Sequence, residues 1–138
     1  MNEKERSARH GMASKSKIRA HWVESLYISK GYDSQKEFLE ADACFACGFD
    51  GPGTLERCHI TALQDGGGNG AENLHLLCPC CHKDSEMLSG DAYWQWFNQR
   101  TFVDRLLSEA VKRGFNAFSA MTAARQFNWR NDAATSED

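Results

Sequence analysis

The chain has 138 residues, of which 41% are hydrophobic and 11% are aromatic. This composition is sufficient for one compact hydrophobic core and excludes wholesale disorder. No apolar run approaches the roughly 20 residues that a membrane-spanning helix needs, and residues 1–17 lack the apolar segment of a signal peptide. We therefore expect a cytoplasmic protein (intracellular, not secreted) with no membrane partner. In that reducing compartment its six cysteines favour metal ligands or free thiols over disulfides.

The charges are unevenly distributed along the chain. The formal net charge is −3, which is unfavourable for binding nucleic acid, because phosphate contacts need Lys and Arg. Residues 1–30 nevertheless contain seven Lys and Arg against three Glu, whereas residues 41–90 contain two against seven acidic residues. A basic segment next to an acidic centre is compatible with binding a phosphate backbone once cations occupy the centre. The alternative, a charged face that is merely solvated, stays open.

The N-terminal part predicts a tail followed by two helices. Residues 1–14 are polar and aperiodic, which predicts a flexible basic tail. Apolar residues recur every four positions over residues 18–26, which predicts an amphipathic helix. Ser34-Gln-Lys-Glu37 has the form of a capping box and predicts a second, short helix. Both helices are expected within residues 15–43.

Residues 44–90, which we call the finger, differ in composition from the rest and contain cysteine pairs, glycines and short apolar runs. Residues 54–63 predict a strand, residues 65–70 a flexible glycine-rich turn, and residues 73–77 a returning strand. The helix that follows is expected to start at His82.

Helices are expected again over residues 91–130, followed by a mildly acidic tail at residues 131–138. The aromatic side chains Tyr93, Trp94 and Phe97 share one face of the first of these helices. We expect this face to pack in the core; stacking on nucleic-acid bases is the less favoured alternative. A second helix is expected to end at Gly114, after two cationic residues, and a last one over residues 116–127.

Four cysteines form two Cys-x-x-Cys pairs with thirty residues between them: Cys44 with Cys47, and Cys78 with Cys81. Two such turns can converge as a closed tetrahedral site of four sulfurs, which suits a structural zinc ion and leaves no open position for chemistry. The zinc would supply stability that so short a segment cannot obtain from burial. A redox-active dithiol is the alternative, but the strand–helix context typical of it is missing. Cys80 is expected to be a spectator, with exchange for a neighbouring ligand as the alternative.

Three residues between and after these pairs carry a resemblance. His59 precedes an aliphatic residue, Asn73 precedes a leucine, and His82 directly follows the second pair, with steps of 14 and 9 residues between them. This arrangement resembles the HNH endonuclease family, the ββα-metal finger nucleases, in their zinc-bound form. The resemblance covers residues 44–86 and implies an α+β fold: a ββα-metal finger with a structural zinc site of four cysteines, flanked by N- and C-terminal helices.

The resemblance also implies roles for these residues. His59 would be the general base that takes a proton from the attacking water, and histidine suits this role because imidazole titrates near physiological pH. His82 would bind one catalytic divalent cation at the scissile phosphate, with competition for the structural zinc as the alternative. Asn73 would position the loop that carries His59. Arg57 would either contact a phosphate or only solvate the hairpin.

The sequence departs from the family pattern at Cys58, where many members have an acidic metal ligand before the general base. A thiolate suits zinc but not magnesium. We expect Cys58 to pack inward, because neighbouring strand residues point to opposite faces; binding of a softer metal is the alternative. Glu86, one turn after His82 on the expected helix, is the best substitute ligand, and Glu56 is a weaker candidate.

Two functions follow from this pattern. The first is a metal-dependent DNA endonuclease that hydrolyses phosphodiester bonds with a structural Zn²⁺ and one catalytic Mg²⁺, Mn²⁺, Ni²⁺ or Zn²⁺ ion. The second is a catalytically inactive, zinc-stabilised module that binds nucleic acid or protein. The expected partner is DNA, and a homodimer or a larger phage or defence complex stays open.

Overall fold

The computed structural model describes residues 11–50 and 54–114. Contacts divide the chain into two compact units, Met1–Phe102 and Val103–Asp138. Most of the expected N-terminal tail, the helix expected over residues 116–127 and the acidic tail lie outside the described residues. The described part mixes helices with one small sheet, so the expected α+β class is confirmed.

The sheet is an antiparallel hairpin of strands β1 (Glu56–His59) and β2 (Leu74–Leu77). The register pairs each residue of β1 with one of β2: Glu56 with Leu77, Arg57 with Leu76, Cys58 with His75, and His59 with Leu74. Both strands are shorter than expected. The ladder ends with the Ile60 N–H, which donates to the Asn73 carbonyl at 2.9 Å, and beyond it the Asn73 side chain bonds the Thr61 backbone in place of a strand. Two short 3₁₀ helices, η1 (Leu63–Asp65) and η2 (Ala71–Asn73), lie within the connection.

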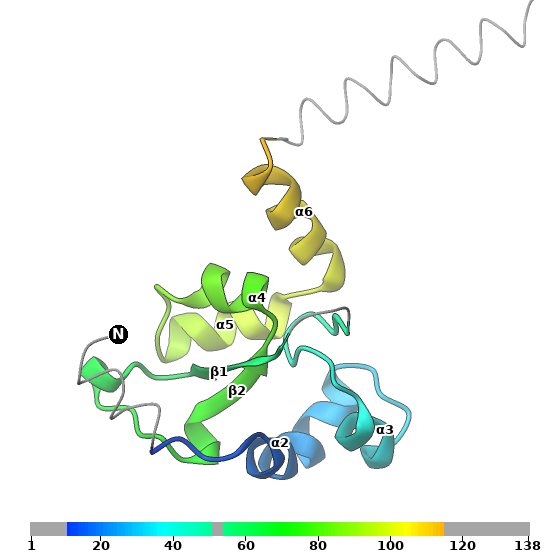
Figure 1. The fold of residues 1–138 in the computed structure, drawn as a ribbon, viewed down its shortest axis with the longest axis vertical. Helices are drawn as coiled ribbons and strands as arrows, with labels where there is room; N and C mark the ends of the chain where they lie inside the picture. Colours follow the sequence, from blue (N-terminus) through cyan, green and yellow to red (C-terminus); the bar gives the residue numbers. More distant parts are fainter. Residues whose placement is uncertain (1–10, 51–53, 115–138) are drawn as a thin grey trace, which may run out of the picture. The chain divides into compact units, whose positions relative to one another are not determined.

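Helices α2 (Lys15–Ser29) and α3 (Gln35–Glu40) form where the sequence predicts them. Each begins at a serine whose hydroxyl accepts a backbone N–H three residues on, Ser14 from Lys17 and Ser34 from Glu37. Trp22 ties α2 to the hairpin, since its indole N–H lies 2.7 Å from the Leu74 carbonyl oxygen. Figure 1 shows α2 and α3 on one side of the hairpin, with α4 and α5 on the other.

Helix α4 (Pro79–Ser85) begins three residues before the expected start at His82. Cys78 is its N-cap, and Pro79 fits the first turn, where a missing N–H costs nothing. The helix therefore places His82 in its middle and ends before Glu86, which is the exposed C-cap residue. Glu86 does not extend the helix face as the sequence suggested, because the helix ends at Ser85.

The core centres on β2 and on α5 (Asp91–Gln99). Tyr93 and Phe97 are fully buried, which confirms the expected core packing of this helix face, and Trp94 packs against the core while partly exposed. His75 lies at the centre, with its ring within 6 Å of the rings of five aromatic residues: Trp22, Phe45, Tyr93, Trp94 and Phe97.

Helix α6 (Phe102–Lys112) is followed by Gly114, whose φ of +93° is the left-handed turn expected there. Across residues 11–50 and 54–114, every helix is too short or too polar to cross a bilayer.

Candidate metal centre and active site

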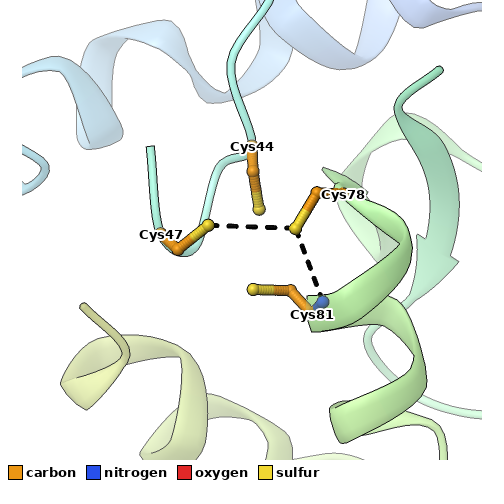
Figure 2. Close-up of side chains that lie close together, drawn as sticks. All are labelled: Cys44, Cys47, Cys78 and Cys81. Carbon is orange, nitrogen blue, oxygen red and sulfur yellow. Dashed lines mark hydrogen bonds between the residues drawn. The ribbon is translucent and has the colours of Figure 1, made fainter. Parts of the chain in front are cut away.

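The two Cys-x-x-Cys pairs converge on one point (Figure 2). Cys44 and Cys47 lie in the turn before Gly48, whose φ of +78° lets the chain reverse direction. Cys78 and Cys81 come from the first turn of α4. The four sulfur atoms lie within 4.8 Å of one another, and all four residues are buried.

The donor set fits a metal ion. A tetrahedral zinc site with Zn–S bonds of about 2.3 Å places its sulfurs about 3.8 Å apart. The Cys47 and Cys78 sulfurs lie 3.8 Å apart, and the Cys81 N–H points at the Cys78 sulfur at 3.5 Å. The cluster can therefore hold an ion such as zinc, and it contains neither Cys80 nor His82. The two ligand exchanges left open from the sequence are thus not favoured.

The four clustered thiols shift one another's pKa values through hydrogen bonds. A hydrogen bond from Cys47 lowers the pKa of Cys44 to about 7, and hydrogen bonds from Cys44 and Cys47 lower that of Cys78. The same contacts raise the pKa values of Cys47 and Cys81. Four such thiols become thiolates together only when a cation replaces the protons, so metal binding would be coupled to the fold.

Two cations that sequence reasoning missed lie beside the cluster. Arg100 Nε donates to the Cys81 sulfur at 3.4 Å, and a hydrogen bond from Arg100 Nη2 to Asp84 (2.6 Å) holds the guanidinium in place. Lys30 Nζ donates to the carbonyls of Ala46 (3.1 Å) and Phe97 (2.8 Å). Burial lowers the pKa of Lys30, and the neighbouring thiolate of Cys44 opposes that shift. These two positive charges would offset the double negative charge of a zinc ion bound by four thiolates.

His59 lies at the end of β1 and is half-buried. Its Nε2 is 2.8 Å from Asn69 Oδ1. An amide oxygen only accepts hydrogen bonds, so Nε2 donates, and in the neutral imidazole Nδ1 keeps its lone pair. The Asn69 carbonyl in turn accepts the Ala13 N–H at 2.9 Å, which ties this loop to the segment before α2. Sequence reasoning missed Asn69, because its role depends on how the glycine-rich turn folds back.

Asn73 holds that turn in place. Its Oδ1 accepts the Thr61 N–H at 2.9 Å, and its Nδ2 donates to the carbonyls of Thr61 (2.9 Å) and Gly68 (2.8 Å). Gly67 packs so closely that a Cβ there would collide with the Thr61 carbonyl oxygen. Asn73 thus bridges the two ends of the loop that follows His59, which is the position expected for a residue that fixes this loop.

His82 makes its contact with Glu56 and not with Glu86. Its Nδ1 lies 3.0 Å from Glu56 Oε1, and both side chains are partly exposed. A carboxylate only accepts, so Nδ1 donates, and in the neutral imidazole Nε2 keeps its lone pair. Metal-ligating histidines commonly donate their other ring N–H to a carboxylate in this way. Glu56, the weaker candidate from the sequence, is the carboxylate that the fold brings to His82.

Cys58 is 4% exposed, and its sulfur lies 3.9 Å from the Ser85 hydroxyl. Burial raises the pKa of its thiol to about 11, so the neutral form prevails near pH 7. A buried neutral thiol is a poor metal ligand, which favours inward packing over metal binding.

The two candidate histidines, His59 and His82, lie at opposite faces of strand β1. Glu56 and Cys58 share one face by strand alternation, and Arg57 and His59 share the other. His82 contacts the face of Glu56. His59 and His82 make no hydrogen bond or ring contact with each other. Strand β1 pairs with β2 on one side only, so within the described residues its second edge is not covered by another strand.

A cavity of about 230 Å³ opens beside the N-terminal half of β1. Its lining residues are Met12, Lys15, Leu55, Glu56, Arg57 and His82. It therefore reaches residues from both faces of β1, as well as the histidine of α4.

The family model described as HNH endonuclease matches residues 44–86, about a third of the chain. No curated protein matches the chain, and no solved structure does. The matched segment contains all four cluster cysteines, His59, Asn73 and His82. The resemblance predicted from the sequence is therefore confirmed: residues 44–86 match the HNH endonuclease family.

Proposed function

We propose that this protein is a metal-dependent DNA endonuclease that hydrolyses phosphodiester bonds at the open edge of β1. The observation that carries the proposal is the complementary way in which the two imidazoles are held. His59 is held through Nε2 and keeps Nδ1 as an acceptor, whereas His82 is held through Nδ1 and keeps Nε2 as an acceptor. One imidazole can accept a proton while the other binds a cation.

The placement of the two residues about β1 fits an in-line displacement. In such a reaction, the attacking water and the leaving oxygen lie on opposite sides of the phosphorus. A phosphodiester lying across the open edge of β1 would have His59 on one side and His82 on the other. His59 Nδ1 would accept the proton of the attacking water as general base. Asn69 and Asn73 would act as positioning residues, the first on the imidazole and the second on its loop.

His82 Nε2 would hold the catalytic cation, with Glu56 fixing the ring as the hydrogen-bond acceptor of Nδ1–H. A bound Mg²⁺, Mn²⁺, Ni²⁺ or Zn²⁺ supplies charge stabilisation at the phosphoryl group and at the leaving 3′ oxygen. A separate structural zinc ion would be held by Cys44, Cys47, Cys78 and Cys81. It would join the segment before β1 to the segment after β2, at the open end of the hairpin. The product would carry a 5′-phosphate if the protein follows the family.

A zinc-stabilised binding module without nuclease activity is the second candidate. One observation favours it: Cys58, at the position before the proposed general base, is buried and neutral and offers no ligand to a cation. Without a ligand from position 58, the affinity of His82 for a cation would be low.

Nicking of supercoiled plasmid by the purified, zinc-loaded chain tests the proposal. We expect nicking with at least one of the four cations, and its loss in His59→Ala. His21→Ala is the matched control, since His21 is an exposed histidine of α2 outside the site. Zinc content and the melting temperature should be unchanged in both variants. Nicking by His59→Ala at the wild-type rate would remove His59 from the mechanism, and no nicking by the wild type with any cation would favour the binding module.

A further inference from the structure

The cavity beside β1 combines positive charge with a position next to the proposed cation site. Two of its lining residues, Lys15 and Arg57, are cations from different segments, the start of α2 and the middle of β1. Among the described residues, neither forms a salt bridge, and the Arg57 guanidinium makes a long 3.4 Å hydrogen bond to the Ala13 carbonyl.

Three arginines among the described residues are paired with carboxylates. Arg19 pairs with Asp42 at 2.8 Å, Arg100 with Asp84 at 2.6 Å, and Arg105 with Glu109 at 3.0 Å. Lys15 and Arg57 therefore retain an attraction for an external anion, which is stronger in a concave site than on a flat surface. Glu56 is the one acidic residue in the lining, and His82 already occupies one of its oxygens.

The dimensions and walls of the cavity limit what it accepts. A volume of about 230 Å³ is below the roughly 300–1,000 Å³ of pockets that enclose drug-sized ligands. It suits one anionic group with part of its backbone, and the apolar side chains of Met12 and Leu55 provide contact for a sugar. The guanidinium of Arg57 can donate two parallel hydrogen bonds to a phosphate, and Lys15 adds a point charge.

We infer that this cavity binds a backbone phosphate of the DNA strand, adjacent to the phosphate at His82, through Lys15 and Arg57. The inference rests on the proposed nuclease function and extends it, since it names where the substrate strand is held. Phosphate contacts set the register of a nucleic acid without reading its sequence, so the site would fix which bond reaches His59 and His82.

Binding in a cleavage-dead background tests this inference. The full, zinc-loaded chain carrying His59→Ala is titrated onto fluorescent duplex DNA at several salt concentrations without an added divalent cation. The further double substitution Lys15→Gln/Arg57→Gln should weaken binding about tenfold and reduce the slope of log K against log salt by about 0.9, the loss of one phosphate contact. Lys17→Gln/Lys36→Gln, which removes two charges outside the cavity, should leave the slope unchanged.

The outcomes separate this inference from the proposed function. If the cavity variant keeps the slope of the His59→Ala protein, or if both double variants reduce it equally, the cavity is not the phosphate site. Nicking that depends on His59 would then still support the nuclease. A second outcome is that only the cavity variant has a smaller salt slope, while the protein with native His59 cuts no DNA with any cation. That result would support the phosphate site and contradict the nuclease function. If thermal melting shows that the double variant is unfolded, Arg57→Lys is measured in its place. This variant retains the positive charge, so its salt slope should lie between those of the cavity variant and the His59→Ala protein.

Discussion

The carboxylate of Glu56 and the imidazole of His82 lie 3.0 Å apart, which joins the first strand of the hairpin to the middle of α4. The contact fixes the orientation of the ring and the nitrogen that carries the proton. An imidazole held in this way loses less freedom when it binds a cation, so in the proposed site the carboxylate would contribute to metal affinity even without touching the metal.

This relationship predicts different effects for two substitutions of Glu56. Glu56→Ala removes the acceptor and should weaken binding of the second cation about 10- to 100-fold, whereas Glu56→Gln keeps an acceptor oxygen and should recover most of that loss. Glu86→Ala should have no effect, since Glu86 is exposed at the end of α4. Calorimetric titration of Mn²⁺ into zinc-loaded protein measures each affinity. Equal losses in Glu56→Ala and Glu56→Gln would instead make Glu56 a direct ligand.

The cysteine cluster predicts that zinc and folding are lost together. Cys44→Ser removes one of four buried donors, so we expect loss of the zinc ion and a cooperative melt that is lost or shifted strongly downward. Cys80→Ser is the matched control, because Cys80 lies beside the cluster without belonging to it. Metal analysis and thermal melts of both variants provide the measurement. Full zinc content in Cys44→Ser would show that the four sulfurs are not the ligand set.

Asn69 predicts a change in pH dependence that a merely structural residue would not cause. In Asn69→Asp, a carboxylate next to Nε2–H favours the protonated imidazole, so the pKa of the base rises. Because the base acts when it is deprotonated, the acidic limb of the rate profile should move to higher pH. Asn69→Ala should lower the rate about tenfold or more through loss of positioning, without that shift. Nicking rates measured between pH 5 and 9 distinguish the two, and an unmoved limb in Asn69→Asp would mean that His59 is not the titrating base.

His75 predicts acid sensitivity of the fold. It is fully buried, its Nδ1 lies 2.7 Å from the Tyr93 hydroxyl, and its Nε2 has no hydrogen-bond partner among the described residues. Burial, with smaller contributions from the positive charges of Lys30 and His21, lowers the pKa of His75 from 6.5 to about 3. The unfolded chain then binds a proton that the folded chain does not.

The stabilisation from neutral His75 is therefore complete above pH 6.5 and is lost as the pH falls toward 3, by up to about 1.4 kcal/mol per pH unit. Denaturant unfolding at several pH values measures this slope. The double variant His75→Phe/Tyr93→Phe, which removes both hydrogen-bonding partners, should be less steep than the wild type over the same range. Zinc release contributes equally to both proteins, so identical slopes would exclude His75 as the source.

Some of these features follow from local sequence and others do not. The four cluster cysteines could be predicted, because each Cys-x-x-Cys turn brings its own two sulfurs together and the hairpin brings the two turns together. Helices α2 and α3 could be predicted for the same reason, since the apolar spacing over residues 18–26 and the capping box at Ser34 are local signals. Such features depend on neighbours in the chain.

The partners of the candidate histidines depend on register and on helix ends. The sequence favoured Glu86 over Glu56 as the carboxylate near His82, because the helix was expected to begin at His82. In the structure Cys78 caps the helix, Glu86 falls at its end, and Glu56 arrives from 26 residues earlier through the pairing of β1 with β2. Lys30 and Arg100 reach the cluster from segments outside the cysteine pattern, so no local spacing predicts their contacts with it.

The hydrogen bond from Arg100 to the Cys81 sulfur has a consequence for chemical durability. In the proposed zinc-bound cluster, a Cys81 thiolate that accepts a hydrogen bond from the guanidinium would be a weaker nucleophile, because oxidants and alkylating reagents act on the same sulfur electrons. Arg100 Nη2 also lies 3.9 Å from the Cys80 sulfur, but Cys80 is partly exposed and outside the cluster, so it is the thiol that such reagents would reach first. Damage at that position would leave the clamp of the hairpin intact, so the cysteine next to the ligands would shield them as a sacrificial site.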